Sequence, residues 1–363
     1  MLDLAAIESA VGAVFDPDLR RTLAELDMID GISATAKRTI RVDVAMPAPG
    51  WLQEQGGRAI ADAVKGIGSV SKVDIETTTM SDDRRDAMLA RIREGRPERP
   101  GGVGSRTRVI SVASGKGGVG KSSVTANTAV ALTRLGHDTA ILDADVWGFS
   151  IPRMLGIEEP PAAVGESMII APAAHGVRAM SMDFFVPTDR AVVWRGPMLH
   201  KALEQFLGDV YWDEPDFLLI DMPPGTGDVA ISLSQFLPRS QTVVVTTPQP
   251  TAQRVARRAA LMASEVDQEI IGIVENMSWF TGDDGTRYPI FGEGGGAALA
   301  ADLGVPLLGT IPLLPALREG ADRGEPVAIA APDSEAAAAF EEIAARIVEA
   351  RPRVRSHPEL VIS

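Results

Sequence analysis

The sequence predicts an α/β fold, a mostly parallel twisted sheet with helices on both faces, preceded by a small α+β domain. From residue 108 onward, apolar segments of strand length alternate with helical patterns, which is typical of a parallel sheet covered on both faces. The first of these strands leads directly into a glycine-rich loop and a helix. Residues 1–80 show a pattern of their own, and 363 residues suffice for one large and one small domain.

The small domain is predicted from alternating polarity and from turn residues. Its expected helices are residues 4–14, 19–26 and 53–65, and its expected strands are residues 32–35, 40–44 and 70–75. None of its residues has catalytic spacing. A charged helix is expected at residues 82–94 and a Pro/Gly-rich linker at residues 95–105. The predicted domains are therefore residues 1–80, a helix and linker at 81–106, a large domain at 107–350 and a tail at 351–363.

The large domain is predicted from apolar runs that end at polar residues. Its expected strands are residues 109–113, 139–142, 217–220, 242–246, 270–274 and 305–311. A helix is expected at residues 123–135, where Gly136 supplies the C-cap, and an alanine-rich helix at residues 334–349 closes the domain.

The loop after the first strand has the pattern G-x-x-x-x-G-K-S, the P-loop motif, in its required setting between a strand and a helix. Glycines let the backbone curve so that its N–H groups surround a phosphate. The motif predicts that Lys121 contacts the β- and γ-phosphates and that the Ser122 hydroxyl binds Mg²⁺. The predicted nucleotide-binding residues of the loop are Gly115, Lys116, Gly117, Gly118, Val119, Gly120, Lys121, Ser122 and Ser123.

A dinucleotide-binding site is the alternative interpretation of this loop. Its glycines also match G-x-G-x-x-G, and Asp143 follows at roughly the expected spacing of about 20 residues. That fingerprint requires neither the Lys121–Ser122 pair nor a second strand that ends in an acid, and this sequence has both. We therefore favour a nucleoside triphosphate.

Two further strands end in carboxylates. The run FLLID places Asp221 at the carboxyl edge of the sheet, where ligands bind in open α/β folds, and predicts a role in the Mg²⁺ site. Asp143 and Asp145 follow residues 139–142. We predict that Asp145 orients the attacking water and that Asp143 supports the metal. The alternative for this pair is one capping aspartate and one solvated one.

The segment that follows Asp221 combines prolines with glycines, a composition that suits a switch loop. In this interpretation the Gly225 N–H group detects the γ-phosphate. The alternative is a tight turn from strand to helix, with Asp228 as the N-cap.

Two residues outside the standard motif are also candidates. Lys116, a second lysine early in the loop, could supply charge to the transition state as an arginine finger does. It is poorly aimed at its own nucleotide, so this role implies a face-to-face homodimer; a solvated lysine is the alternative. Asn276 follows the strand 270–274 and could contact a base. The N-K-x-D set that selects guanine is absent, so adenine is favoured, and a structural asparagine remains the alternative.

Composition excludes several classes of function. The net charge of −14 disfavours nucleic acid as a partner. No apolar run approaches the roughly 20 residues of a membrane span, and the first residues carry acids where a signal peptide needs basic residues, so we expect a cytoplasmic protein without a membrane partner. There is no cysteine, and the four histidines are far apart and suggest no zinc site.

Six segments together resemble the Mrp/ApbC-type ATPases, the iron–sulfur cluster carrier family, within the deviant P-loop class that includes the nitrogenase iron protein, MinD and ParA. The segments are SGKGGVGKSSVTAN, DADVWGFSIP, DFLLIDMPPGTGD, TTPQPTA, VENMS and FGEGGG. The resemblance implies ATP hydrolysis with Mg²⁺, a homodimer, and iron–sulfur recipient or assembly proteins as partners. It also implies that Lys116 reaches across the dimer, that Ser122 and Asp221 serve Mg²⁺, that Asp145 serves hydrolysis and that Asn276 contacts adenine.

The sequence departs from the family at one point. Members usually carry a C-P-x-C pair shortly after ENMS, through which two subunits share a [4Fe–4S] cluster, whereas residues 279–288 read WFTGDDGTRY here. Some relatives have a cysteine in the small domain, near the place of Trp51. The resemblance therefore implies a cluster, but no iron–sulfur ligand is identifiable. An ATP-gated interaction switch of the MinD/ParA kind and a scaffold with structural ATP are the alternative functions.

Overall fold

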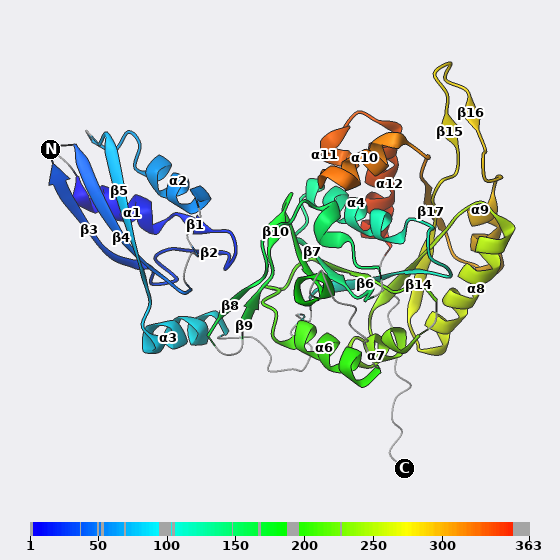
Figure 1. Ribbon diagram of the computed structural model, residues 1–363, viewed down its shortest axis with the longest axis horizontal. Coiled ribbons are helices and arrows are strands. Elements are labelled where there is room, and N and C mark those ends of the chain that lie inside the picture. Colours follow the sequence, from blue (N-terminus) through cyan, green and yellow to red (C-terminus); the bar gives the residue numbers. More distant parts are fainter. Residues whose placement is uncertain are drawn as a thin grey trace, which may run out of the picture. The chain divides into compact units, whose positions relative to one another are not determined.

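The chain forms two compact units in the computed structural model (Figure 1). The smaller unit comprises residues 1–98, 161–171 and 209–213, and the larger unit comprises residues 99–160, 172–208 and 214–363. The residues that the structure describes are 3–36, 38–48, 51, 54–68, 70–93, 103, 106–146, 148–165, 168–186, 196–225 and 227–350. The predicted tail lies outside these residues, as does nearly all of the predicted linker.

An eight-stranded sheet forms the centre of the larger unit, in the order β10-β11-β7-β12-β6-β13-β14-β17. All neighbouring strands run parallel except β10 and β11, as predicted for a mostly parallel sheet. The strands are β6 (Arg108–Ser114), β7 (Thr139–Asp143), β10 (Ala173–Ala174), β11 (Val177–Ser181), β12 (Phe217–Asp221), β13 (Gln241–Thr246), β14 (Glu269–Glu275) and β17 (Leu307–Thr310).

Helices cover both faces of this sheet, and the side chains of β13 show it directly. Val243 and Val245 belong to the apolar cluster shared with α4 and α12, whereas Val244 belongs to the cluster shared with α8 and α9. The fold class predicted from the sequence is confirmed. The helices are α4 (Lys121–Arg134), α5 (Ile151–Met154), η1 (Met182–Phe185), α6 (Gly196–Gly208), α7 (Asp228–Phe236), α8 (Pro250–Glu265), α9 (Gly295–Leu303), α10 (Pro315–Arg323), α11 (Val327–Ala330) and α12 (Glu335–Glu349).

The smaller unit has a three-stranded sheet in the order β3-β4-β5, in which β3 and β4 are antiparallel and β4 and β5 parallel. Its elements are α1 (Leu4–Gly12), β1 (Phe15–Asp16), β2 (Arg21–Thr22), β3 (Ile29–Ala36), β4 (Thr39–Met46), α2 (Glu54–Ala63), β5 (Lys72–Thr79), α3 (Asp82–Arg93), β8 (Ala162–Val164) and β9 (Met168–Ile170). No helix among the described residues of the chain is long and apolar enough to cross a membrane.

The helix predicted at residues 19–26 is wrong, because turns and the short strand β2 replace it. The Asp16 carboxylate accepts hydrogen bonds from the backbone N–H groups of Asp18 and Leu19, and also from the Trp51 indole at 2.8 Å. Arg20 and Asp27 have positive φ angles of 53° and 56°. Such residues interrupt a helix, so the local hydrogen bonds of the aspartate outweigh the helical spacing of the leucines.

Residues 161–171 and 209–213, which lie within the sequence of the predicted large domain, complete the core of the smaller unit. Val164, Met168, Ile170 and Tyr211 are buried in the same apolar cluster as the side chains of α1, β4 and α3. The Tyr211 hydroxyl donates to the backbone carbonyl of Leu19 at 3.3 Å. The smaller unit therefore extends past residue 80 and includes later residues, a grouping that a local sequence pattern cannot show.

Replacing Ile170 by Ala should lower the stability of the smaller unit by about 2–4 kcal/mol, because a buried isoleucine leaves a cavity there. Ile170 is 4% exposed. Native-state hydrogen exchange would measure this as faster exchange of the β4 amides. Ile169→Ala, a half-buried neighbour on the same strand, is the control and should have a smaller effect. Equal effects of the two variants on β4 would contradict the assignment of this strand to the core.

Candidate functional site

The glycine-rich loop joins β6 to α4, as its motif predicts. Gly118 and Gly120 have φ angles of 79° and 81°, a backbone conformation that residues with a Cβ rarely adopt. A Cβ on Gly115 would lie 2.2 Å from the backbone of Val255 in α8, so only glycine fits there. Gly120 is also the N-cap of α4, and no side chain caps that helix. The first backbone N–H groups of α4 can therefore donate hydrogen bonds to a bound anion.

Asp221 is the centre of the polar cluster beside this loop. Its carboxylate is fully buried and accepts hydrogen bonds from the hydroxyls of Ser122 at 2.6 Å and Thr125 at 2.8 Å. The Lys121 ammonium lies 2.7 Å from the same carboxylate and 3.5 Å from that of Asp145. The parallel pairing of β12 with β6 and β7 brings these groups together at one edge of the sheet.

The hydroxyl and carboxylate of this cluster fit a magnesium site. Mg²⁺ prefers oxygen ligands and is usually held by one or two carboxylates together with phosphate oxygens. Ser122 and Asp221 offer such oxygens in direct contact with each other. Thr125 was missed in the sequence, although it stands four residues after Lys121 and so shares its helix face.

Asp143 is fully buried and takes part in a network of its own. Its carboxylate accepts hydrogen bonds from the backbone N–H groups of Asp145, Ser150 and Ile151 and from the Ser181 hydroxyl. Burial, and next the neighbouring carboxylate of Asp221, raise the pKa of Asp143 to about 7. These contacts fix the loop after β7, so Asp143 positions Asp145, and its predicted contribution to the metal site stays a prediction.

Two predicted phosphate contacts make other hydrogen bonds in this structure. The Lys116 ammonium donates to the Gln249 side-chain carbonyl at 3.3 Å. Among the described residues, it makes no contact with the cluster around Asp221. The Gly225 N–H group donates to the Ser114 carbonyl at 2.9 Å, with a φ angle of 95°. Both roles therefore stay predictions.

Asn276 lies beside the P-loop, where its amide nitrogen donates to the Val119 carbonyl at 2.9 Å. Its amide oxygen accepts from the N–H group of Met277 at 3.0 Å. The amide nitrogen keeps a second N–H group for a further acceptor, and the contact with adenine that the sequence predicts stays a prediction.

Comparison with known proteins identifies the family. A family model of the ParA group, described as "NUBPL iron-transfer P-loop NTPase", matches residues 105–348. The chain belongs to this family. The resemblance drawn from the six motifs is thereby confirmed.

Relatives named iron–sulfur cluster carrier protein match most of the chain. That of Mycobacterium tuberculosis is 46% identical over 345 residues, which are 91% of this chain and 89% of the relative. That of Bacillus subtilis is 41% identical over 313 residues, 85% of this chain and 87% of the relative. The match thus includes the small domain as well as the P-loop domain, so the chain is an iron–sulfur cluster carrier P-loop NTPase by family.

Solved structures resemble the P-loop domain. A nucleotide-binding protein from Archaeoglobus fulgidus in complex with ADP is 35% identical, with a TM-score of 0.55 over 64% of this chain and 91% of that chain. The cell-division ATPase MinD of Pyrococcus furiosus is 25% identical, with a TM-score of 0.50 over 67% of this chain and 98% of that chain. Both likenesses fit the P-loop NTPase fold.

Residues 280–288, which follow the ENMS segment, form a β-hairpin. Their side chains do not fit an iron–sulfur cluster. β15 (Phe280–Thr281) and β16 (Arg287–Tyr288) pair around a turn that contains Asp284 and Gly285. The Glu335 carboxylate accepts from Trp279 and Thr281, and the Arg287 guanidinium lies 4.2 Å from the Trp279 ring centre. With no cysteine in the sequence, no thiolate is available. The described side chains also show no group of three or more metal-binding residues of the His, Cys, Asp and Glu types.

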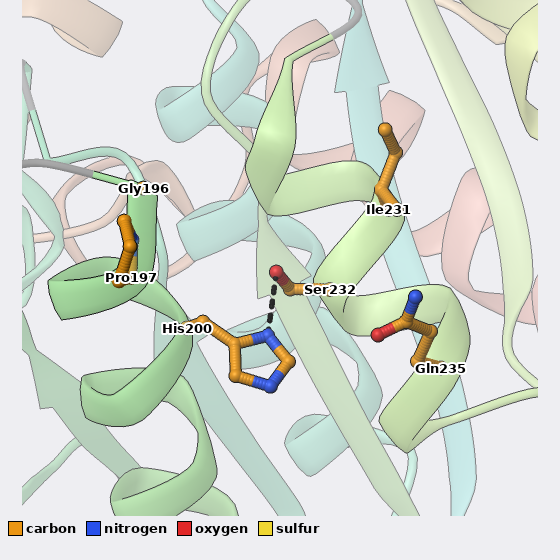
Figure 2. A pocket seen from close by; sticks show the side chains of 6 residues that line it. All are labelled: Gly196, Pro197, His200, Ile231, Ser232 and Gln235. Atoms are coloured by element: carbon orange, nitrogen blue, oxygen red, sulfur yellow. Dashed lines mark hydrogen bonds between the residues drawn. The ribbon is translucent and has the colours of Figure 1, made fainter.

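A shallow cavity of about 330 Å³ lies between α6 and α7 (Figure 2). The His200 Nδ1 atom and the Ser232 hydroxyl face each other across it at 3.0 Å. The sequence did not predict this feature. No residue of the P-loop or of the Asp221 cluster lines it, so it is separate from the nucleotide site.

Proposed function

We propose that this family member binds and hydrolyses ATP with Mg²⁺, giving ADP and phosphate. The direct hydrogen bond between the P-loop hydroxyl of Ser122 and the strand-end carboxylate of Asp221 is the observation that carries the proposal. Hydroxyl and carboxylate in this arrangement bind Mg²⁺ in ATP hydrolases. Phosphate release by the purified chain, measured with Mg²⁺ and again with EDTA, tests it. Turnover that EDTA does not reduce would overturn the magnesium requirement.

The roles follow from the geometry of the site. The curved loop and the N-terminus of α4 would bind the phosphates, and Lys121 would exchange its contact with Asp221 for one with the β- and γ-phosphates. Mg²⁺ would neutralise charge that develops on the phosphates. Asp145 is buried beside Lys121 and would orient the attacking water. Its position is held by Asp143.

We propose that the working unit is a homodimer in which Lys116 of one subunit completes the site of the other. The contact of this lysine with Gln249, away from the Asp221 cluster of its own chain, supports the proposal. ATP and Mg²⁺ are supplied in the cytoplasm, which is the compartment we propose.

The cargo that we propose is an iron–sulfur cluster, since the relatives that match most of the chain are named for carrying one. The thiolates would then come from a recipient or assembly protein, because this chain has none. Nucleic acid is not among the proposed partners, given the net charge of −14. A membrane is not among them either, because no apolar run in the sequence approaches the length of a membrane span.

Anaerobic reconstitution with iron and sulfide should leave the purified chain without bound iron. Carboxylates are hard ligands, and clusters in proteins are held by thiolates, so the Asp-Gly hairpin offers no substitute. Iron quantitation and visible absorption after desalting would measure the result. A retained cluster close to one per dimer would contradict the expectation and would require ligands other than cysteine.

An ATP-gated interaction switch is the second candidate function. The likeness to MinD and the absence of any cysteine favour it. The two candidates differ in a transfer assay, in which a cluster-loaded scaffold protein and an apo-recipient are mixed with this chain. ATP-dependent acceleration of the transfer supports the carrier function, and ATP hydrolysis without acceleration supports the switch.

A further inference from the structure

Thr125 lies on α4, one helical turn after Lys121, and is completely buried. Its hydroxyl oxygen is 2.8 Å from Oδ1 of Asp221 and 3.0 Å from the backbone carbonyl of Lys121. Both of these groups are acceptors, and a hydroxyl has a single hydrogen to donate. The contact with the carboxylate is the shorter of the two and is charge-assisted, so the Thr125 hydroxyl donates mainly to Asp221.

The two oxygens of the Asp221 carboxylate have different partners. Oδ1 accepts from Thr125, whereas Oδ2 accepts from the Ser122 hydroxyl at 2.6 Å and lies 2.7 Å from the Lys121 ammonium. The torsion that turns a carboxylate about its Cβ–Cγ bond is soft, so a hydrogen bond to one oxygen decides where the other oxygen points. By holding Oδ1 against α4, Thr125 leaves Oδ2 facing the hydroxyl of the P-loop.

The other two partners of Asp221 have further roles in the proposed reaction. Lys121 would leave the carboxylate for the β- and γ-phosphates, and the Ser122 hydroxyl would share its oxygen with Mg²⁺ while its hydrogen stays on Asp221. Two hydroxyls would then hold the carboxylate, one on each oxygen. Thr125 is the one of these two that contacts neither the phosphates nor the metal in the proposed roles, so its effect on the site passes through Asp221 alone.

We infer that Thr125 is a positioning residue of the magnesium site, which holds Oδ1 of Asp221 and so keeps Oδ2 turned toward Ser122. Without its hydroxyl, Oδ1 loses this donor in a fully buried position, and the carboxylate turns away from Ser122 to find another. This inference rests on the proposed magnesium-dependent function and specifies how the same site is built. A threonine that only donated to the carbonyl of its own helix would affect the stability of α4 and not the binding of Mg²⁺.

The test separates magnesium binding from nucleotide binding. The affinity of the full-length protein for ADP is measured by calorimetry with Mg²⁺ and again with EDTA, and the ratio of the two affinities is the gain that Mg²⁺ provides. Thr125→Val keeps the shape of the side chain and removes the hydroxyl. We expect the gain to fall about 10-fold, as for a hydrogen bond to a charged group, while the affinity in EDTA stays within about twofold of the wild type. The Mg²⁺ concentration that gives half-maximal ATP hydrolysis should rise by a similar factor.

Thr133→Val is the matched control. Thr133 lies on the same helix, and its hydroxyl donates to the backbone carbonyl four residues earlier, that of Ala129, at 3.1 Å. Within the described part of the chain it contacts no carboxylate, so its loss should change neither affinity for ADP. Thr125→Ser keeps the hydroxyl and should retain the gain of the wild type. If Thr125→Val does not fold, Thr125→Cys, whose thiol is a weaker donor, should show a smaller loss of the gain.

Three results would overturn the inference. If folded Thr125→Val keeps the wild-type gain from Mg²⁺, the hydroxyl does not position Asp221. If the affinity for ADP falls equally with Mg²⁺ and with EDTA, Thr125 supports the P-loop and not the magnesium site. If Thr125→Ser loses as much of the gain as Thr125→Val, the methyl group and not the hydroxyl matters. Failure of the proposed function looks different, because the wild type itself would then show no gain from Mg²⁺.

Discussion

Replacing Asp221 by Asn is expected to reduce ATP hydrolysis about 100- to 1,000-fold, since metal stabilisation of transition-state charge is worth several kcal/mol and each 1.4 kcal/mol is about tenfold in rate. The carboxylate is fully buried and holds the Ser122 hydroxyl, the Thr125 hydroxyl and the Lys121 ammonium at once. Asparagine removes the charge that Mg²⁺ and Lys121 require and places a donor among donors. Phosphate release at saturating ATP and Mg²⁺ measures the effect.

Asp322→Asn is the control for that experiment. Asp322 lies on α10 with an exposed side chain and pairs with Arg318 at 3.1 Å, a surface contact that contributes little. It should hydrolyse ATP as the wild type does. A circular dichroism melt of Asp221→Asn shows whether the variant is folded. A folded Asp221→Asn that keeps wild-type turnover would show that this carboxylate does not serve the metal.

The sheet could be predicted from the sequence because most of its strands contain a continuous apolar run. Strands such as β7, β12 and β13 are buried along their whole length, and in a parallel sheet such runs stand out from the helices between them. The smaller unit was harder to predict. Its core takes Ile170 and Tyr211 from distant parts of the chain, and its Asp16 turn replaces a helix that the leucine spacing predicted.

The candidate site, too, could be predicted from the sequence only in part. The motifs predicted the cluster of Lys121, Ser122 and Asp221, because a P-loop and the carboxyl end of a neighbouring parallel strand must meet at one edge of the sheet. The motifs could not show the hydrogen-bond partners of individual side chains. These partners depend on the packing of α8 and β14 against the loop. In this packing Asn276 donates to the loop and Lys116 donates to Gln249.

The missing thiolates bear on how the family function operates in this chain. The hairpin β15–β16 stands where the family resemblance implies a cysteine pair, and contacts among Glu335, Trp279 and Arg287 stabilise it. Its turn follows β14, the strand that also carries Asn276. Asn276 donates to the Val119 carbonyl of the P-loop, and the hairpin follows it closely in the sequence, so one short segment contacts the loop and leads into the hairpin.

Replacing Lys116 by Ala is expected to reduce hydrolysis about 1,000-fold or more while ATP binding stays close to that of the wild type, as for removal of an arginine finger. The half-buried Lys116 does not contact Asp221 in its own chain, so it adds little to the binding of its own nucleotide. Calorimetry and phosphate release separate the two effects. Lys201→Ala, an exposed lysine on α6, is the control and should keep both properties.

A mixing experiment decides whether Lys116 acts within its own subunit or on the partner. Lys116→Ala keeps Asp221, and Asp221→Asn keeps Lys116, so a mixed dimer has one site with both groups only if the lysine crosses the interface. An equal mixture of the two inactive variants should then recover about a quarter of wild-type turnover, because roughly half of the dimers are mixed and each has one complete site. No recovery, with mixed dimers verified by mass spectrometry, would place the lysine in its own site and remove the reason for a face-to-face dimer.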